Sequence, residues 1–366
     1  MKTKKNKKIN NKSNKLNKLN KSNKLNKKTT YLCKHSLKKT YHGKLFDHPS
    51  KPLKSYKLNV SDIHTISFKT YGNPNGKPVL YVHGGPGGGT RPSMARFFNP
   101  SKYYIVLVDQ RGCGKSKPLG ELRENTIQDL VNDFEQIRKK LNIKKWMLCG
   151  GSWGSTLSLY YAIRHPEVIS ELLLRAVFLG SREEIDWLSE QHGAENINPI
   201  GWEYYIKSIP EEYRNKYRNK LSYIDAYGKC FNGDFGDAKR NDCLLSWAAW
   251  EDMNLKLNMH TLPYIINKLK QSKSYKYTVL IEYHYFINKC FMEEGFLLKK
   301  ENIDRIRHIP TKIIQGVYDM ICPFKYAYLL HKAFPEAEFY PTMAGHSSYD
   351  KENIKHIVEA TNDFAK

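Results

Sequence analysis

The sequence has no hydrophobic run long enough to cross a membrane, since none approaches 18 consecutive apolar residues. Its N-terminus also lacks the apolar stretch of a secretory signal peptide. The cysteines do not form the pattern of a disulfide framework, because the 7 of them are scattered, odd in number and include no C-x-x-C pair. Such usage is typical of reduced thiols and argues against a disulfide-stapled domain or a structural zinc site. We therefore expect a cytoplasmic protein without a metal site.

Acidic residues are missing from the first 46 positions, and so is arginine. The same positions contain 16 lysines, which supply +16 of the formal net charge of +24, and the octapeptide NKSNKLNK occurs there twice. A segment of this composition cannot bury enough apolar surface to offset its ordering entropy. Residues 1–40 are therefore predicted to form a disordered tail.

The tail has two interpretations. A polybasic arm can contact nucleic acid or another polyanion. However, lysine, asparagine, isoleucine and tyrosine are abundant throughout the chain, which favours a compositional bias. Aromatic side chains that could stack on bases are also nearly absent from the tail. We therefore favour the compositional explanation over a nucleic-acid contact, and we expect no membrane partner.

The rest of the chain, from about residue 56, alternates short apolar strands with amphipathic helices. Compact apolar runs at 77–85 and 103–112 end in glycine turns and are typical of inner strands of a parallel sheet. The stretch 126–142 repeats apolar residues at helical spacing, and 170–180 is the next predicted strand. This alternation predicts an α/β fold with a mostly parallel sheet and helices on both faces.

Residues 181–304 interrupt this alternation. They are rich in tryptophan, tyrosine and acidic residues and are predicted to be mostly helical. We interpret them as a helical cap inserted into one α/β core, whose two parts comprise residues 41–180 and 305–366. In the second part a strand, a helix, a strand and a closing helix are predicted.

The stretch GGSWG at 150–154 has the G-x-S-x-G pattern of a nucleophile elbow. The pattern alone is weak, but its context fits, because an apolar strand precedes it and helical spacing follows it. Glycine at both flanking positions would let the strand and the helix pack closely beside the turn. Ser152 is therefore the predicted nucleophile, and the alternative is a structural turn between strand and helix.

A serine nucleophile needs a base and a group that orients the base. In α/β hydrolases these follow the serine in the order acid, then histidine. Asp319 follows one predicted strand and His346 follows the next, so both are expected at the carboxyl end of the sheet. Taken alone, Asp319 could be a turn former and His346 a solvated loop residue. Their order and their positions at strand ends favour a Ser-Asp-His triad.

The glycine-rich stretch HGGPGGG at 83–89 also follows a predicted strand. It lacks the Lys-Ser/Thr pair of a phosphate-binding P-loop and does not meet the G-x-G-x-x-G frame. It does match the loop that supplies an oxyanion N–H group in α/β hydrolases. We expect the backbone N–H groups of Trp153 and Gly85 to stabilise the negative charge that develops on the substrate oxygen.

Several of these stretches together resemble a proline iminopeptidase (prolyl aminopeptidase), a serine peptidase family of the α/β-hydrolase fold. The resemblance covers roughly residues 44–366, and it is carried by YGNPNGKPVLYVHGGPGGG, DQRGCGKS, GGSWGSTLSL, GVYDMICP and AGHS. It implies an enzyme that removes N-terminal proline from peptides through an acyl-enzyme, without a metal or other cofactor. The implied partner is a peptide whose N-terminal proline is free.

The same resemblance points to substrate-binding residues in the cap. The segments WAAWE and EYHYF resemble those whose glutamates hold the amino end of the substrate, which assigns that role to Glu251 and Glu282. A substrate cation would offset the repulsion between two neighbouring carboxylates. Phe178 resembles the aromatic wall for the proline ring, although it could equally be an ordinary core residue. Tyr283 departs from the asparagine usual in the family, which leaves the shape of the amine pocket open.

Two other functions remain open at this point. One is an α/β hydrolase that acts on another small ester or amide, for which Tyr283 would be one clue. The other is a catalytically idle fold that serves as a binding protein through its basic tail, against which the complete triad argues. Epoxide hydrolases and dehalogenases are disfavoured because they need an aspartate where Ser152 stands.

Overall fold

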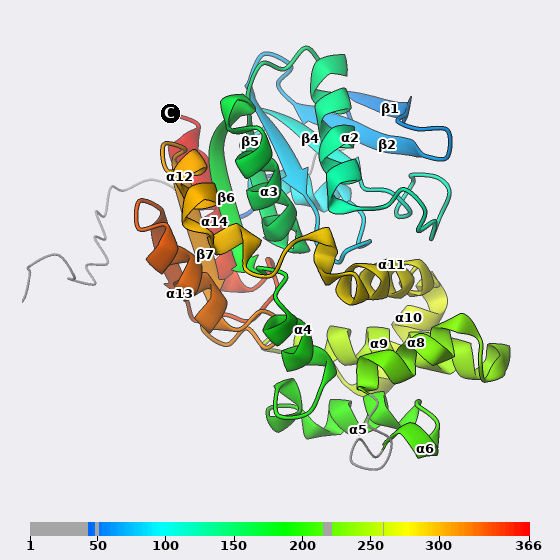
Figure 1. The fold of residues 1–366 in the computed structure, drawn as a ribbon. Helices are drawn as coiled ribbons and strands as arrows, with labels where there is room; N and C mark the ends of the chain where they lie inside the picture. The colour runs from blue at the N-terminus through cyan, green and yellow to red at the C-terminus, as the bar shows by residue number, and fades with distance from the viewer. Residues whose placement is uncertain (1–42, 48–50, 215–221, 259) are drawn as a thin grey trace, which may run out of the picture. The chain divides into compact units, whose positions relative to one another are not determined.

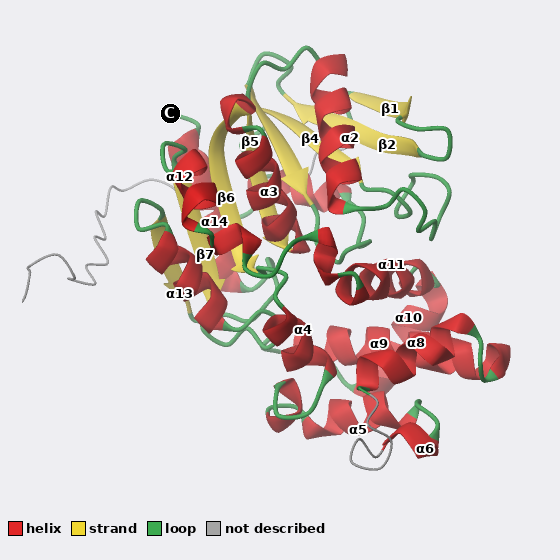
Figure 2. Ribbon diagram, in the orientation of Figure 1, coloured by secondary structure: helices red, strands yellow, loops and turns green. Residues whose placement is uncertain are grey.

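The computed structural model describes residues 43–47, 51–214, 222–258 and 260–366 (Figure 1). The predicted tail at residues 1–40 lies outside the described residues, and the statement about its disorder stays a prediction. The described residues all fall within one unit, His42–Lys366, whose strands and helices are distinguished in Figure 2.

Eight strands form a single sheet in the order β1-β2-β4-β3-β5-β6-β7-β8. Strand β2 pairs antiparallel with β1 and β4, and all other neighbours are parallel. The mostly parallel sheet that the sequence predicts is thus confirmed. From β1 to β8 the strands span Lys54–Asn59, Thr65–Gly72, Lys77–Val82, Tyr103–Asp109, Trp146–Ser152, Ile169–Val177, Thr311–Gly316 and Glu338–Thr342.

Both faces of this sheet are apolar, so both are covered. Along β4 successive side chains alternate, with Val106 and Val108 in one hydrophobic core and Ile105 and Leu107 in the other. Three α-helices contribute to the first core together with the helices between β6 and β7, and one α-helix with a short 3-10 helix contributes to the second. These are α2 (Ile127–Lys140), α3 (Trp153–Arg164) and α13 (Phe324–Ala333), and then α14 (Lys351–Phe364) with η1 (Pro92–Phe97).

Helix α2 shows how local sequence sets an element of the core. It begins after Thr126, whose hydroxyl accepts a hydrogen bond from the backbone N–H of Asp129, while the Asp129 carboxylate accepts from Thr126 in return. This capping box satisfies N–H groups that the first helical turn leaves without partners. The apolar residues that predict the helix, among them Leu130 and Phe134, are buried on its inner face.

Helices occupy the chain between β6 and β7, where the cap is predicted (Figures 1 and 2). Large aromatic side chains hold them together, since Trp202, Tyr205, Trp247 and Trp250 contact one another within the same hydrophobic core. The division into core and cap at residues 181 and 304 stays a prediction. The helices are α4 (Arg182–Ser189), α5 (Pro199–Lys207), α6 (Glu211–Arg214), α8 (Tyr223–Asn232), α9 (Gly236–Asn254), α10 (Leu262–Ser272), α11 (Tyr275–Ile287) and α12 (Lys300–Ile306), with the short 3-10 helices η3 (Ala194–Asn196), η4 (Lys289–Phe291) and η5 (Phe296–Leu298).

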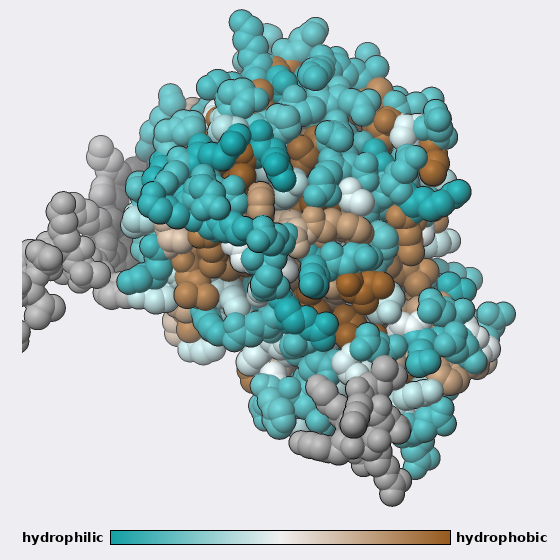
Figure 3. Space-filling model, in the orientation of Figure 1, coloured by the Kyte–Doolittle hydropathy of each residue, from teal (hydrophilic) through white to brown (hydrophobic). Residues whose placement is uncertain are grey.

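The visible surface is mostly hydrophilic, and apolar residues reach it around α11 (Figure 3). Helix α11 also contacts the core directly, because a Cβ atom added to Gly87 would lie 3.2 Å from Ile281. Gly87 belongs to the glycine-rich loop after β3. The helix that carries Glu282 is therefore packed against the loop expected to bind the oxyanion.

Candidate active site

Ser152 stands at a sharp turn between the end of β5 and the start of α3. Its backbone has φ 58° and ψ −132°, a conformation that a non-glycine residue adopts only under strain. The turn is possible because neither flanking glycine has a side chain. A Cβ atom on Gly150 would lie 2.1 Å from the Gly154 carbonyl oxygen, and one on Gly154 would lie 2.1 Å from the Val82 carbonyl oxygen. The geometry is that of a nucleophile elbow.

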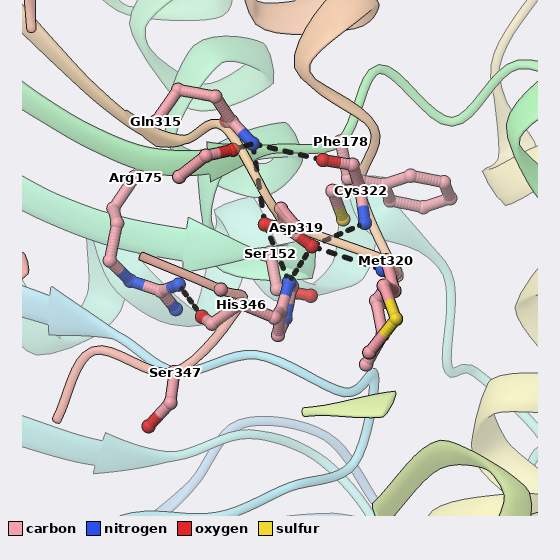
Figure 4. A network of polar contacts seen from close by, with 12 residues as sticks. Ser152, Arg175, Phe178, Gln315, Asp319, Met320, Cys322, His346 and Ser347 are labelled. Carbon is pink, nitrogen blue, oxygen red and sulfur yellow. Dashed lines mark hydrogen bonds and ion pairs between the residues drawn. The ribbon is translucent and has the colours of Figure 1, made fainter. Parts of the chain in front are cut away.

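His346 and Asp319 are joined side chain to side chain. Nδ1 of His346 lies 3.0 Å from each carboxylate oxygen of Asp319 (Figure 4). Asp319 follows β7 and His346 follows β8, so the sheet brings together two loops that the sequence predicts at its carboxyl edge. With Nδ1 donating to the carboxylate, Nε2 of the imidazole is the nitrogen left to accept a proton.

Backbone and side-chain donors fix the Asp319 carboxylate in turn. The N–H groups of Ile321 and Cys322 donate to Oδ1 at 3.0 and 2.8 Å. The Gln315 side-chain amide donates to Oδ2 at 3.3 Å and to the Cys322 carbonyl at 2.9 Å (Figure 4). Its own carbonyl oxygen accepts from the Val177 N–H at 2.8 Å. Gln315 thus ties the Asp319 loop to β6 and orients the carboxylate.

Sequence reasoning missed Gln315, Arg175 and Cys322. Arg175 donates a hydrogen bond to the His346 carbonyl and packs against Gly151 beside the elbow. Cys322 lines the same cavity as Ser152, and burial raises the pKa of its thiol well above the usual range. For Gln315 and Arg175 a signal was present, because a polar residue inside an otherwise apolar strand must find a partner when it is buried.

The predicted site residues meet around one cavity of about 330 Å³. Ser152 and His346 line it, and so do Phe178, Glu251 and Glu282, together with Gly85. Trp153 does not line it with its side chain, which is fully buried and donates its indole N–H to Gln110 at 3.0 Å. Trp153 is the first residue of α3 and directly follows Ser152.

The carboxyl groups of Glu251 and Glu282 are hydrogen-bonded to each other across two cap helices, α9 and α11. Burial raises the pKa of both groups, and the negative charge of Glu251 raises that of Glu282 further. The Trp247 indole N–H donates to Glu282 at 2.9 Å and partly offsets this rise. Glu282 is buried and Glu251 partly exposed, and among the described residues no lysine or arginine forms an ion pair with either carboxyl. The pair is therefore suited to a positively charged group.

Aromatic side chains line the same part of the cavity. Phe178 is 6% exposed, and its ring centroid lies 5.9 Å from that of Phe286, which also lines the cavity. Tyr283 lies elsewhere. Its ring packs edge-on against Phe231 at 5.2 Å, and its hydroxyl occupies the place where Gly228 has no side chain. The residue that left the pocket shape open in the sequence is therefore packed between cap helices and does not line the cavity.

Glu184 is a third acidic residue at this cavity, and sequence reasoning did not single it out. Its side chain is 2% exposed and accepts hydrogen bonds from the N–H groups of Leu179 and Ser181 and from the Ser181 hydroxyl. Burial raises its pKa to about 7. The S-x-x-E spacing of Ser181 and Glu184 is that of a capping box, which explains its place at the start of α4.

The described ranges contain neither a metal-binding cluster nor a helix that could span a membrane. Among residues 43–47, 51–214, 222–258 and 260–366, no group of three or more His, Cys, Asp or Glu side chains is arranged to hold a metal ion. Over the same part of the chain, no helix has both the length and the apolar character needed to span a bilayer.

Comparison with known proteins identifies the relatives of this chain. A family profile described as "alpha/beta hydrolase fold" matches residues 77–352. A "Probable proline iminopeptidase" of Leptolyngbya boryana is 44% identical over 314 residues, which cover 86% of this chain and 94% of that protein. The "Proline iminopeptidase" of Arabidopsis thaliana is 45% identical over 304 residues, covering 82% of this chain and 77% of that protein.

Solved structures show the same fold at low sequence identity. A bacterial membrane phospholipase A superimposes with a TM-score of 0.55 at 13% identity, covering 85% of this chain and 86% of that one. A bromoperoxidase from Bacillus anthracis gives a TM-score of 0.54 at 16% identity, covering 85% and 98%. These likenesses concern the arrangement of the sheet and its helices alone.

Proposed function

Because the chain belongs to the proline iminopeptidase family of α/β hydrolases, we propose that it is a serine exopeptidase that releases N-terminal proline from peptides. The observation that carries this proposal is the cavity itself. It joins the Ser152–His346 pair on the core to the paired carboxyls of Glu251 and Glu282 on the cap. The cavity thus contains both a nucleophile and a site for a cation. This combination fits a substrate whose reacting carbonyl is close to its free amino end.

In the first half of the reaction, the Ser152 hydroxyl attacks the carbonyl carbon of the N-terminal proline. His346 takes the hydroxyl proton at Nε2, and Asp319 stabilises the imidazolium through Nδ1. The bond from carbon to the leaving nitrogen then breaks, and the same proton passes from His346 to the leaving amine. In the second half, water takes the place of the serine as nucleophile, and free proline leaves.

The negative oxygen of each tetrahedral intermediate needs hydrogen-bond donors. The Trp153 N–H is aligned with the N-terminus of α3, which favours negative charge. The loop of Gly84 and Gly85 approaches the serine closely, since a Cβ atom on Gly84 would lie 3.2 Å from the Ser152 Cβ. We assign the oxyanion donors to the backbone N–H groups of Trp153 and Gly85, each worth about 3–4 kcal/mol of transition-state stabilisation.

Selectivity for a free amino end follows from the cap. A protonated proline nitrogen supplies the cation that the Glu251–Glu282 pair lacks, and the Phe178 and Phe286 rings face the cavity where an apolar ring would lie. Acetylation of that nitrogen removes the charge and adds bulk. The carboxyls would then be desolvated without a partner, which is costly.

The test is a set of chromogenic anilides of proline, alanine and N-acetylproline, assayed with the full chain. We expect proline anilide to exceed acetylproline anilide in kcat/KM by at least about a hundredfold, or about 2.7 kcal/mol. Equal rates on the two would overturn the proposal. The chain would then be an esterase or amidase for small substrates, the first alternative that the sequence leaves open.

A further inference from the structure

The cavity also contains basic groups. Arg91 and Arg175 line it with Ser347 and Ser348, whereas Glu251 and Glu282 are among its acidic lining residues. In Figure 4, Arg175 and Ser347 lie on one side of His346 and Phe178 lies on the other. Arg175 therefore lies across His346 from Phe178, whose ring contacts Phe286 on the helix that also carries Glu282.

Among the residues that the structure describes, neither arginine has an acidic partner. In the described parts of the chain, no carboxylate lies within ion-pair distance of the Arg91 or Arg175 guanidinium. Arg91 is exposed at the rim, so its guanidinium is free to move toward a ligand. Arg175 is only partly exposed, and its hydrogen bond to the His346 carbonyl fixes it in place. A guanidinium presents a planar set of donors that matches a carboxylate.

The proposed reaction determines which part of the substrate these arginines would contact. With the proline nitrogen at Glu251 and Glu282 and the ring beside Phe178, the leaving peptide would extend from Ser152 away from Phe178, toward the side of His346 where Arg175 lies. In a dipeptide, the free carboxylate is only one residue beyond the scissile bond, and each residue spans at most about 3.6 Å. A short substrate would thus place its cation at the glutamates and its anion at the arginines of the cavity.

We propose that Arg91, supported by Arg175, forms a subsite for a carboxylate on the leaving group. This inference rests on the proposed function and names its substrate class: short peptides that begin with proline and carry a negative charge just beyond the cleaved bond. Two sources of that charge share the same chemistry. One is the C-terminal carboxylate of a dipeptide, and the other is an acidic side chain after proline.

The test compares substrates that differ only in this charge. We would measure proline release from Pro-Ala and Pro-Ala-amide, and from Pro-Glu-amide and Pro-Gln-amide. We expect the charged member of at least one pair to have about a tenfold higher kcat/KM at low ionic strength, and we expect salt to reduce this preference. The substrate pair in which the charged member is preferred identifies whether the carboxylate comes from the C-terminus or from an acidic side chain.

Arg91→Gln should reduce that preference to less than about threefold. The matched control is Arg305→Gln, an exposed arginine of α12 that does not line the cavity, which should leave the preference intact. A substitution of Arg175 would test the subsite less cleanly. Arg175 also holds the His346 backbone in place, so its loss would lower the rate of cleavage for every substrate. Equal kcat/KM within both pairs, or an undiminished preference in Arg91→Gln, would overturn the subsite. Inactivity on proline anilide would instead overturn the proposed function.

Discussion

Glu251 and Glu282 are hydrogen-bonded to each other, although they come from two different helices of the cap. Burial raises the pKa of each carboxyl and so favours its protonated form, and the negative charge of Glu251 raises the pKa of Glu282 further. The pair therefore changes its charge at a higher pH than ordinary glutamates. We therefore expect the ionisation of this pair to be visible in the pH dependence of kcat/KM.

The first prediction concerns this pH dependence. A cationic substrate binds best when the carboxyls are ionised, so its kcat/KM should fall as pH drops through their raised pKa. The ratio of kcat/KM for proline anilide to that for p-nitrophenyl acetate removes effects common to both substrates. We expect this ratio to rise with pH from about 4.5, the usual glutamate range, and to level off above the raised pKa. Glu282→Gln should flatten the rise, and a flat ratio in the unmodified protein would contradict the assignment.

The second prediction concerns the two glutamates directly. Glu251→Gln and Glu282→Gln should each lower kcat/KM for proline anilide by about tenfold to a hundredfold, because a charged hydrogen bond is worth about 1.5–3 kcal/mol. Each should also narrow the gap between free and acetylated substrate. Glu203→Gln, at an exposed position on α5, is the matched control and should change neither quantity. An unchanged gap in both cavity variants would show that these residues do not select the amino end.

The third prediction concerns the nucleophile. Ser152→Ala should abolish turnover while the protein stays folded, because the change removes only a hydroxyl at a turn. A serine-directed phosphonate should modify the unmodified protein at Ser152, as peptide mass spectrometry would show. The matched control, Ser272→Ala at an exposed position on α10, should retain activity. Phosphonate attached to a different serine, or turnover by Ser152→Ala, would refute the assignment.

The fourth prediction concerns the elbow glycines and stability. Gly154→Ala should lower the free energy of unfolding by about 3 kcal/mol, since its methyl group would meet the Val82 carbonyl oxygen and overpack a rigid site. Gly295→Ala is the comparison, because a Cβ atom there meets nothing within 4 Å and only the positive φ of 72° opposes it. Urea unfolding would measure both. A smaller loss for Gly154→Ala than for Gly295→Ala would contradict the packing argument.

The α/β fold and the family were predictable from the sequence, and both are confirmed. The elbow was predictable because its contacts are local: Gly150 at the end of β5 packs against the Gly154 carbonyl, only four residues along the chain. The roles of Ser152, Asp319 and His346 stay predictions to be tested by the variants above. The structure adds their geometry, in which the carboxylate and the imidazole are 3.0 Å apart.

Other features had no local signature. Tyr283 departs from the family pattern, and sequence reasoning left its effect on the amine pocket open. In the structure its hydroxyl fills the space above Gly228 on a neighbouring cap helix. Nothing in either segment indicates that the two helices meet there. In the same way, Gln315 is one polar residue in an apolar strand, and only the arrangement of β6 and β7 gives it both Val177 and Asp319 as partners.

The sequence by itself determined which chemical groups are present and in what order, because strand ends, glycine turns and the order of serine, aspartate and histidine depend on neighbouring residues. Only the tertiary structure decided which charges face each other. It placed Glu251 against Glu282 and brought Arg91 and Arg175 to the lining of the same cavity. These pairings depend on how helices and loops pack across the sheet. Burial then sets their energies, because a charge removed from water must find its partner within the protein or in the substrate.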